Sequence, residues 1–193
     1  MKAKILSSRF LFIFSMLLVV SIVRFFPHLA NLTPLAAIAL FAGVQIRNGK
    51  MAFLTPMVIW LLSDVGLEIM YHLGLRAYPG FYPYMISVYI SFALIVLIGR
   101  LIRNKINPLT VISGALGGSL VFFIVSNFGV WLLEAEMMYT NDWNGLVNCF
   151  VAAIPFYKNA VLGDLLYSTV LFGGFYFLER KIPTLAPIRE EIK

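Results

Sequence analysis

Long apolar segments, separated from one another by only a few polar residues, are the feature that most constrains this chain. A membrane-spanning helix needs about 20 mainly apolar residues, and such segments recur along the whole sequence. Hydrophobic residues make up 61% of the 193 residues and charged residues only 12%, whereas a soluble domain has about 25% charged residues. Too little polar surface remains to cover a globule in water, so the sequence predicts a single integral membrane domain.

The apolar segments predict an all-α membrane bundle with about six transmembrane helices. The last apolar stretch, residues 146–178, is too long for one straight span, and Pro155, Lys158 and Asn159 divide it. We therefore interpret residues 146–156 as a re-entrant or interfacial piece. The expected spans are residues 10–26, 34–44, 51–70, 84–102, 108–133 and 159–178.

The distribution of basic residues predicts that both ends of the chain are cytoplasmic. Lysine and arginine are enriched in cytoplasmic loops of membrane proteins. With the N-terminus inside, only Arg24, Arg76 and Lys158 of the 15 basic residues fall outside. The other basic residues, expected inside, are Lys2, Lys4, Arg9, Arg47, Lys50, Arg100, Arg103, Lys105, Arg180, Lys181, Arg189 and Lys193.

Several functional classes find no support in the sequence. The single cysteine, Cys149, and two distant histidines, His28 and His72, make neither a disulfide nor a metal site. No phosphate-binding loop and no nucleophile–base set is present. The net charge of +6 follows from membrane orientation. We therefore expect no enzyme activity, no cofactor and no nucleic-acid partner.

Polar residues inside the expected spans gather at one depth, toward the outside. An ionisable residue in a span is costly and usually faces the protein interior or a cavity. Asp64 lies in the outer half of the third span, and Asn127 and Trp131 lie four residues apart on the fifth. Asp164 follows Asn159 by just over one helical turn on the sixth. These positions predict a polar cluster in the outer part of the bundle.

Two roles for this cluster remain open. In the first it binds a ligand, with Arg24 and the segment that follows it forming a lid. In the second it is structural: Arg24 pairs with Asp64 or Asp164, and Asn127 forms interhelical hydrogen bonds. The candidate ligand-binding residues are Arg24, His28, Asn31, Asp64, Asn127, Trp131, Asn159 and Asp164.

Several stretches resemble an uncharacterised family of small bacterial membrane proteins described as candidate transport proteins. The opening signature is residues 24–43, from Arg24-Phe-Phe-Pro-His to Leu-Phe-Ala-Gly43. Leu62-Ser-Asp64, Ser126-Asn-Phe-Gly-Val-Trp131, Ala152-Ala-Ile-Pro-Phe-Tyr-Lys-Asn159 and Leu162-Gly-Asp-Leu-Leu-Tyr167 continue it in order. The resemblance covers nearly the whole chain.

That family is similar to the substrate-binding S components of energy-coupling-factor (ECF) vitamin transporters. The resemblance implies six helices, cytoplasmic termini, and a partner in the form of a transmembrane coupling subunit with two ATPases. We therefore expect a multi-pass protein of the inner (plasma) membrane that binds a small solute, such as a vitamin or related micronutrient, for uptake. The alternative is a non-transport accessory or assembly subunit of a larger membrane complex.

Overall fold

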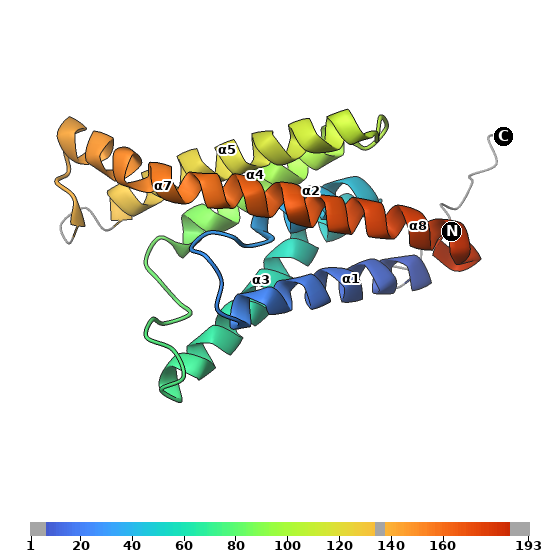
Figure 1. The fold of residues 1–193 in the computed structure, drawn as a ribbon, viewed down its shortest axis with the longest axis horizontal. Helices are drawn as coiled ribbons and strands as arrows, with labels where there is room; N and C mark the ends of the chain where they lie inside the picture. Colours follow the sequence, from blue (N-terminus) through green and yellow to red (C-terminus); the bar gives the residue numbers. More distant parts are fainter. Residues whose placement is uncertain (1–6, 134–137, 186–193) are drawn as a thin grey trace.

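The computed structural model describes residues 7–133 and 138–185, and every regular element within them is helical. Figure 1 shows a bundle in which the helices run roughly between two ends. The elements are α1 (Ser8–Ser21), η1 (Ile22–Phe25), α2 (Leu35–Gln45), α3 (Gly49–His72), α4 (Met85–Ile102), α5 (Pro108–Leu133), α7 (Trp143–Ser168), the π-helical η2 (Thr169–Gly173), α8 (Gly174–Lys181) and η3 (Pro183–Leu185).

The fold is an all-α membrane helix bundle, as the sequence predicts. In the described part of the chain, five helical segments are long and apolar enough to span a membrane. Large apolar side chains cover their outward faces, among them Leu101, Leu109 and Ile86. In water such a surface would be strongly unfavourable, whereas hydrocarbon accommodates it. The five segments are Ser8–Phe25, Gly49–His72, Met85–Ile102, Pro108–Leu133 and Trp143–Lys181.

The short helix α2 forms the centre of the bundle. It packs against α1, α3, α4, α5 and α7, and all its residues except Gln45 are buried. Glycine permits the closest of these contacts. A Cβ atom on Gly43 would lie 2.4 Å from the Val96 carbonyl oxygen, and one on Gly99 would lie 2.5 Å from that of Leu40. The backbones of α2 and α4 therefore touch directly, as small-residue faces allow.

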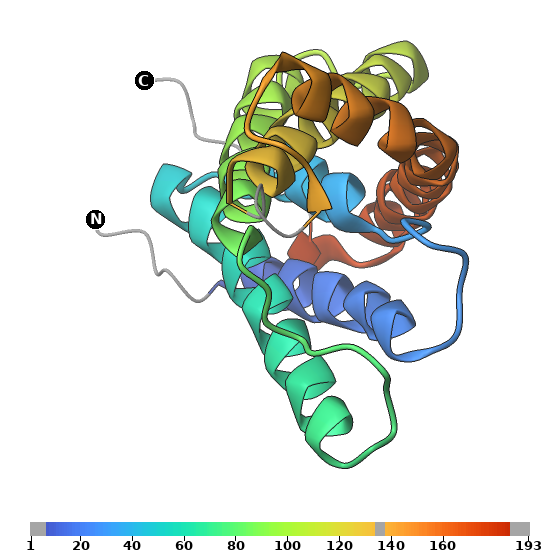
Figure 2. The ribbon, with the colours of Figure 1, turned by 90° about the vertical axis from the view of Figure 1, so that its left-hand side faces the viewer.

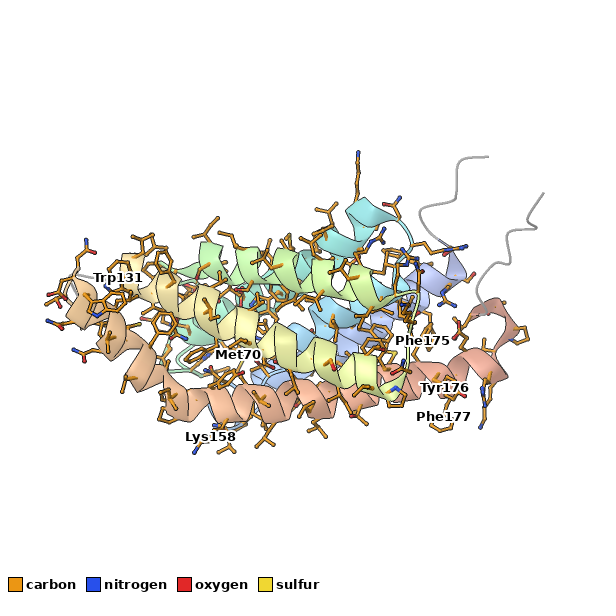
Figure 3. The ribbon with its side chains drawn as sticks, turned by 90° about the horizontal axis from the view of Figure 1, so that it is seen from above. Met70, Trp131, Lys158, Phe175, Tyr176 and Phe177 are labelled. Carbon is orange, nitrogen blue, oxygen red and sulfur yellow. The ribbon has the colours of Figure 1, made fainter. Side chains whose placement is uncertain are left out.

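The expected division of the last apolar stretch is wrong. Residues 146–156 are neither a re-entrant segment nor separated from residues 159–178, because α7 runs without interruption from Trp143 through Pro155 and continues through η2 and α8 to Lys181. Proline is tolerated inside membrane helices when its surroundings compensate for the missing N–H bond. Lys158 does not break the helix either, since its side chain points away from the bundle (Figure 3).

One end of the bundle, which we call the basic end, joins the start of α1 to the end of α8. Arg9 forms an ion pair with Glu179 at 2.5 Å, donates a hydrogen bond to Gln45 at 2.9 Å and donates another to the Leu185 carbonyl. Arg100 donates to two backbone carbonyls in the connection between α2 and α3. Basic groups that the sequence predicts to be inside therefore meet at one end. Lys2, Lys4, Arg189 and Lys193 lie outside the described residues.

Candidate functional site

A cavity of about 390 Å³ lies toward the other end of the bundle, which we call the loop end. The loop end is formed by residues 26–34, which connect η1 to α2, and residues 73–84, which connect α3 to α4. Figure 2 views the molecule from this side and shows α3 splayed away from α5 and α7. Side chains from both loops and from η1, α2, α3, α4, α5 and α7 line the cavity. Its volume is that of a small-molecule site.

The short length of α2 explains where the cavity lies. Eleven helical residues extend about 16 Å, roughly half the hydrocarbon thickness of about 30 Å. α2 reaches the basic end through Gln45, so its N-terminus stops inside the bundle. Thr33 and Leu35 at that N-terminus line the cavity. The cavity therefore occupies the space toward the loop end that a longer α2 would fill.

Arg24 of η1 is held rigidly at the cavity wall. Its guanidinium forms an ion pair with Asp64 of α3 at 2.6 Å, donates to the Ser63 hydroxyl, and lies over the Trp60 ring at 3.6 Å from the centroid. Asp64 itself is fully buried and does not line the cavity. The pairing of Arg24 with Asp64, one of the two alternatives left open by the sequence, is the one observed. Asp64 thus orients Arg24 and leaves the guanidinium to face the cavity.

The loop of residues 26–34 covers one side of the cavity. Asn31 adopts a left-handed backbone conformation with φ of 62°, which asparagine tolerates better than most residues. Asn159 of α7 holds the loop by donating to the Ala30 carbonyl at 3.0 Å. His28 and Asn31 line the cavity, whereas Asn159 does not. Asn159 therefore positions the loop that the sequence predicts to be a lid.

The loop of residues 73–84 is attached to α3 through Glu68. The Glu68 carboxylate accepts hydrogen bonds from the backbone N–H groups of Gly80 at 2.7 Å and Phe81 at 3.1 Å. Gly80 packs so tightly that a Cβ atom there would lie 2.1 Å from the Asp64 carbonyl oxygen. This attachment brings Arg76 to the cavity wall.

Two tyrosines of the same loop also line the cavity. Tyr82 and Tyr84 have ring centroids 4.6 Å apart. Burial raises the pKa of the Tyr82 phenol above its usual value, so the hydroxyl stays protonated and can both donate and accept a hydrogen bond. Arg76 and these tyrosines are not among the site residues that the sequence predicts. The sequence feature that indicates them is an isolated arginine in a loop rich in tyrosine and phenylalanine.

Asp164 has a structural position away from the cavity. One carboxylate oxygen accepts hydrogen bonds from the backbone N–H groups of Ala36 at 3.0 Å and Ala37 at 3.2 Å, and the other accepts from the Ser119 hydroxyl at 2.7 Å. These N–H groups belong to the first turn of α2, which has no intrahelical partners for them. Asp164 of α7 therefore caps α2 and joins it to α5. It neither pairs with Arg24 nor lines the cavity.

The two candidates on α5 differ in position. Asn127 lines the cavity and donates to the Phe123 carbonyl one turn below at 2.7 Å. Trp131 does not line it; its indole N–H donates to the Thr140 carbonyl at 3.1 Å, at the loop end of the bundle (Figure 3). Of the eight sequence candidates, the cavity thus brings together Arg24, His28, Asn31 and Asn127.

The cavity lining combines apolar and polar groups. Aromatic and aliphatic residues are the more numerous, and Arg24, Arg76, Asn31 and Asn127 are among the polar residues. In the described part of the chain, no group of three or more His, Cys, Asp or Glu side chains is placed to hold a metal ion. The fold and the cavity together define an integral membrane helix bundle with a solute-sized pocket near one end.

Comparison with known proteins assigns the family. Residues 4–185 match the family of unknown function DUF6580, so the chain belongs to that family. No curated protein and no solved structure matches the chain.

Proposed function

We propose that this protein is the substrate-binding subunit of a membrane transport system and takes up a small solute. The observation that carries the proposal is the cavity of about 390 Å³ at the loop end, walled by aromatic side chains and by Arg24, Asn31 and Asn127. A helix bundle that served only as a structural partner would have no evident use for an open, partly polar cavity of this size.

The proposed orientation puts the loop end outside the inner (plasma) membrane and the basic end in the cytoplasm. It follows from the bias of lysine and arginine toward one end of the bundle. In this orientation the cavity faces the medium from which the solute comes. The arrangement agrees with the resemblance to S components, which bind their vitamins from the outer side. Since the sequence has no phosphate-binding loop, energy comes from a coupling subunit with ATPases or from an ion gradient.

Native mass spectrometry of the gently purified protein tests this function. The wild-type chain should retain a small molecule, which accurate mass and fragmentation identify. Ala153 lines the cavity, whereas its neighbour Ala152 is exposed on α7 and does not. Ala153→Phe should fill the cavity and release the molecule, and the matched control Ala152→Phe should retain it.

An uptake assay completes the test. Cells that make the wild-type chain should accumulate the identified compound faster than cells that make Ala153→Phe at equal membrane abundance. A wild-type protein that retains no compound, together with equal uptake by both variants, would contradict transport and favour the non-transport accessory subunit.

A further inference from the structure

The two charged side chains among the described residues that line the cavity, Arg24 and Arg76, are both cationic. No aspartate or glutamate of the described ranges 7–133 and 138–185 lines it. The Asp64 carboxylate, which does not line the cavity, is fully buried and pairs with the Arg24 guanidinium at 2.6 Å. Asp64 therefore balances the charge of Arg24, and the positive charge of Arg76 is left over.

Arg24 lines the cavity from the bundle, and Arg76 lines it from the exposed loop of residues 73–84. Within the described ranges, Arg76 forms no ion pair. Two guanidinium groups that line one cavity repel each other, and more strongly where the surrounding protein lowers the effective dielectric than in bulk water. An anion between them would relieve this repulsion, whereas a cation would increase it.

Arg24 also retains hydrogen-bond donors for a ligand. A guanidinium carries five N–H groups, and Arg24 donates to the Ser63 hydroxyl, the Trp60 carbonyl and Asp64. The remaining N–H groups can bind an oxyanion in the geometry that arginine favours. The Ala36 and Ala37 N–H groups at the N-terminus of α2 do not compete for that role, because the Asp164 carboxylate already accepts from them.

Aromatic rings form the rest of the wall. Phe123 of α5 and Tyr157 of α7 lie with ring centroids 4.8 Å apart, and Tyr82 and Tyr84 form a second pair. Rings of this kind stack on flat apolar groups. The cavity therefore combines an anion-binding part at Arg24 and Arg76 with an aromatic part.

We propose that the ligand is a small soluble organic anion, with a carboxylate or similar oxyanion held by Arg24 and Arg76 and a flat apolar portion packed against the aromatic rings. This proposal rests on the proposed function, since it names the class of solute bound at the same site. The volume of about 390 Å³ suits a molecule of this size. A phospholipid headgroup would be the other source of an oxyanion, and the identity of the retained compound distinguishes the two.

Matched pairs of probes test the charge requirement directly. Nicotinate with nicotinamide, and indole-3-acetate with indole-3-acetamide, differ only in the replacement of a carboxylate by a neutral amide. Titration calorimetry on the full-length protein in mild detergent should show tighter binding of the carboxylate in at least one pair. The expected ratio is roughly tenfold to a hundredfold, the range for hydrogen bonds to a charged group.

Two variants separate a local effect from a general loss of positive charge. Arg76→Gln removes a cation that lines the cavity, whereas Lys158→Gln removes one that points away from the bundle at the outer face of α7. Both side chains are exposed, so both variants should fold. Arg76→Gln should reduce the affinity for the carboxylate probe by roughly tenfold or more, and Lys158→Gln should leave it within about twofold.

The results distinguish this proposal from the function on which it rests. Equal binding of carboxylate and amide, equal effects of the two variants, or a retained compound that is neutral, cationic or a phospholipid would overturn the anion proposal. A retained neutral or cationic solute would leave the transport function standing. Failure of the protein to retain any compound, combined with no binding of any probe, would overturn both.

Discussion

The capping of α2 by Asp164 makes the most specific prediction for stability. Asp164→Leu keeps a side chain of comparable length but removes every hydrogen-bond acceptor. Because Ala36 and Ala37 are fully buried, their N–H groups would then have no partner from either protein or water. The Ser119 hydroxyl would keep its alternative acceptor, the Ala115 carbonyl at 3.0 Å.

The magnitude follows from the two backbone donors. A buried donor left without a partner costs about 1–3 kcal/mol, so Asp164→Leu should lower the free energy of unfolding by about 2–6 kcal/mol. Asp164→Asn should behave differently, because its amide oxygen can still accept from Ala36 and Ala37, and its NH₂ group can donate to Ser119. Only the charge at the helix N-terminus is lost, which is worth about 0.3–2 kcal/mol.

Reversible unfolding in mixed detergent micelles, with increasing mole fraction of dodecyl sulfate, measures both variants against the wild type. The free energy of unfolding is obtained by linear extrapolation. Asn148→Leu, at an exposed position of the same helix, is the control and should unfold like the wild type. Amide hydrogen exchange adds a local measurement, since Asp164→Leu should speed exchange at Ala36 and Ala37 more than elsewhere.

An Asp164→Leu protein as stable as the wild type would show that the carboxylate does not stabilise the start of α2. Equal losses of stability in Asp164→Leu and Asp164→Asn would show the same for its hydrogen bonds, because only Asp164→Asn can keep them. If Asp164→Asn lowered the affinity for the ligand without changing the stability, Asp164 would instead be a ligand-binding residue.

The remaining predictions concern orientation and close packing. In a Cys149→Ser background, Ala3→Cys and Ile192→Cys should resist an impermeant thiol reagent in intact cells, since both ends are expected inside; labelling of either from outside would contradict this orientation. Gly80→Ala should displace the loop that contains it, because its Cβ atom would lie 2.1 Å from a carbonyl oxygen, and limited trypsin digestion should then cut that loop faster than in the wild type. Gly99→Leu should lower the free energy of unfolding by about 1–3 kcal/mol through overpacking against α2; unchanged stability would show that α2 and α4 can separate without loss.

The sequence by itself determined the class of fold and the position of most helices. The lengths of the apolar segments and the scarcity of charged residues predicted helix bounds close to those observed. The physical reason is that each span needs a minimum length and that its backbone must satisfy its own hydrogen bonds in a membrane. Sequence also indicated that Arg24 and Asn127 lie at one depth, since depth along a helix follows from residue number and rise per residue. Both residues line the cavity.

Only the tertiary structure decided what each polar residue touches. Asp164 and Ala36 are 128 residues apart, and nothing in either segment specifies that α7 lies beside the start of α2. The continuity of α7 through Pro155 was also decided in three dimensions, because a proline breaks or continues a membrane helix according to the groups around it. Arg76 reaches the cavity only because Glu68 binds its loop. Depth is a property of one helix, whereas a contact depends on which helices are neighbours, and hydrophobic periodicity along a chain does not encode that choice.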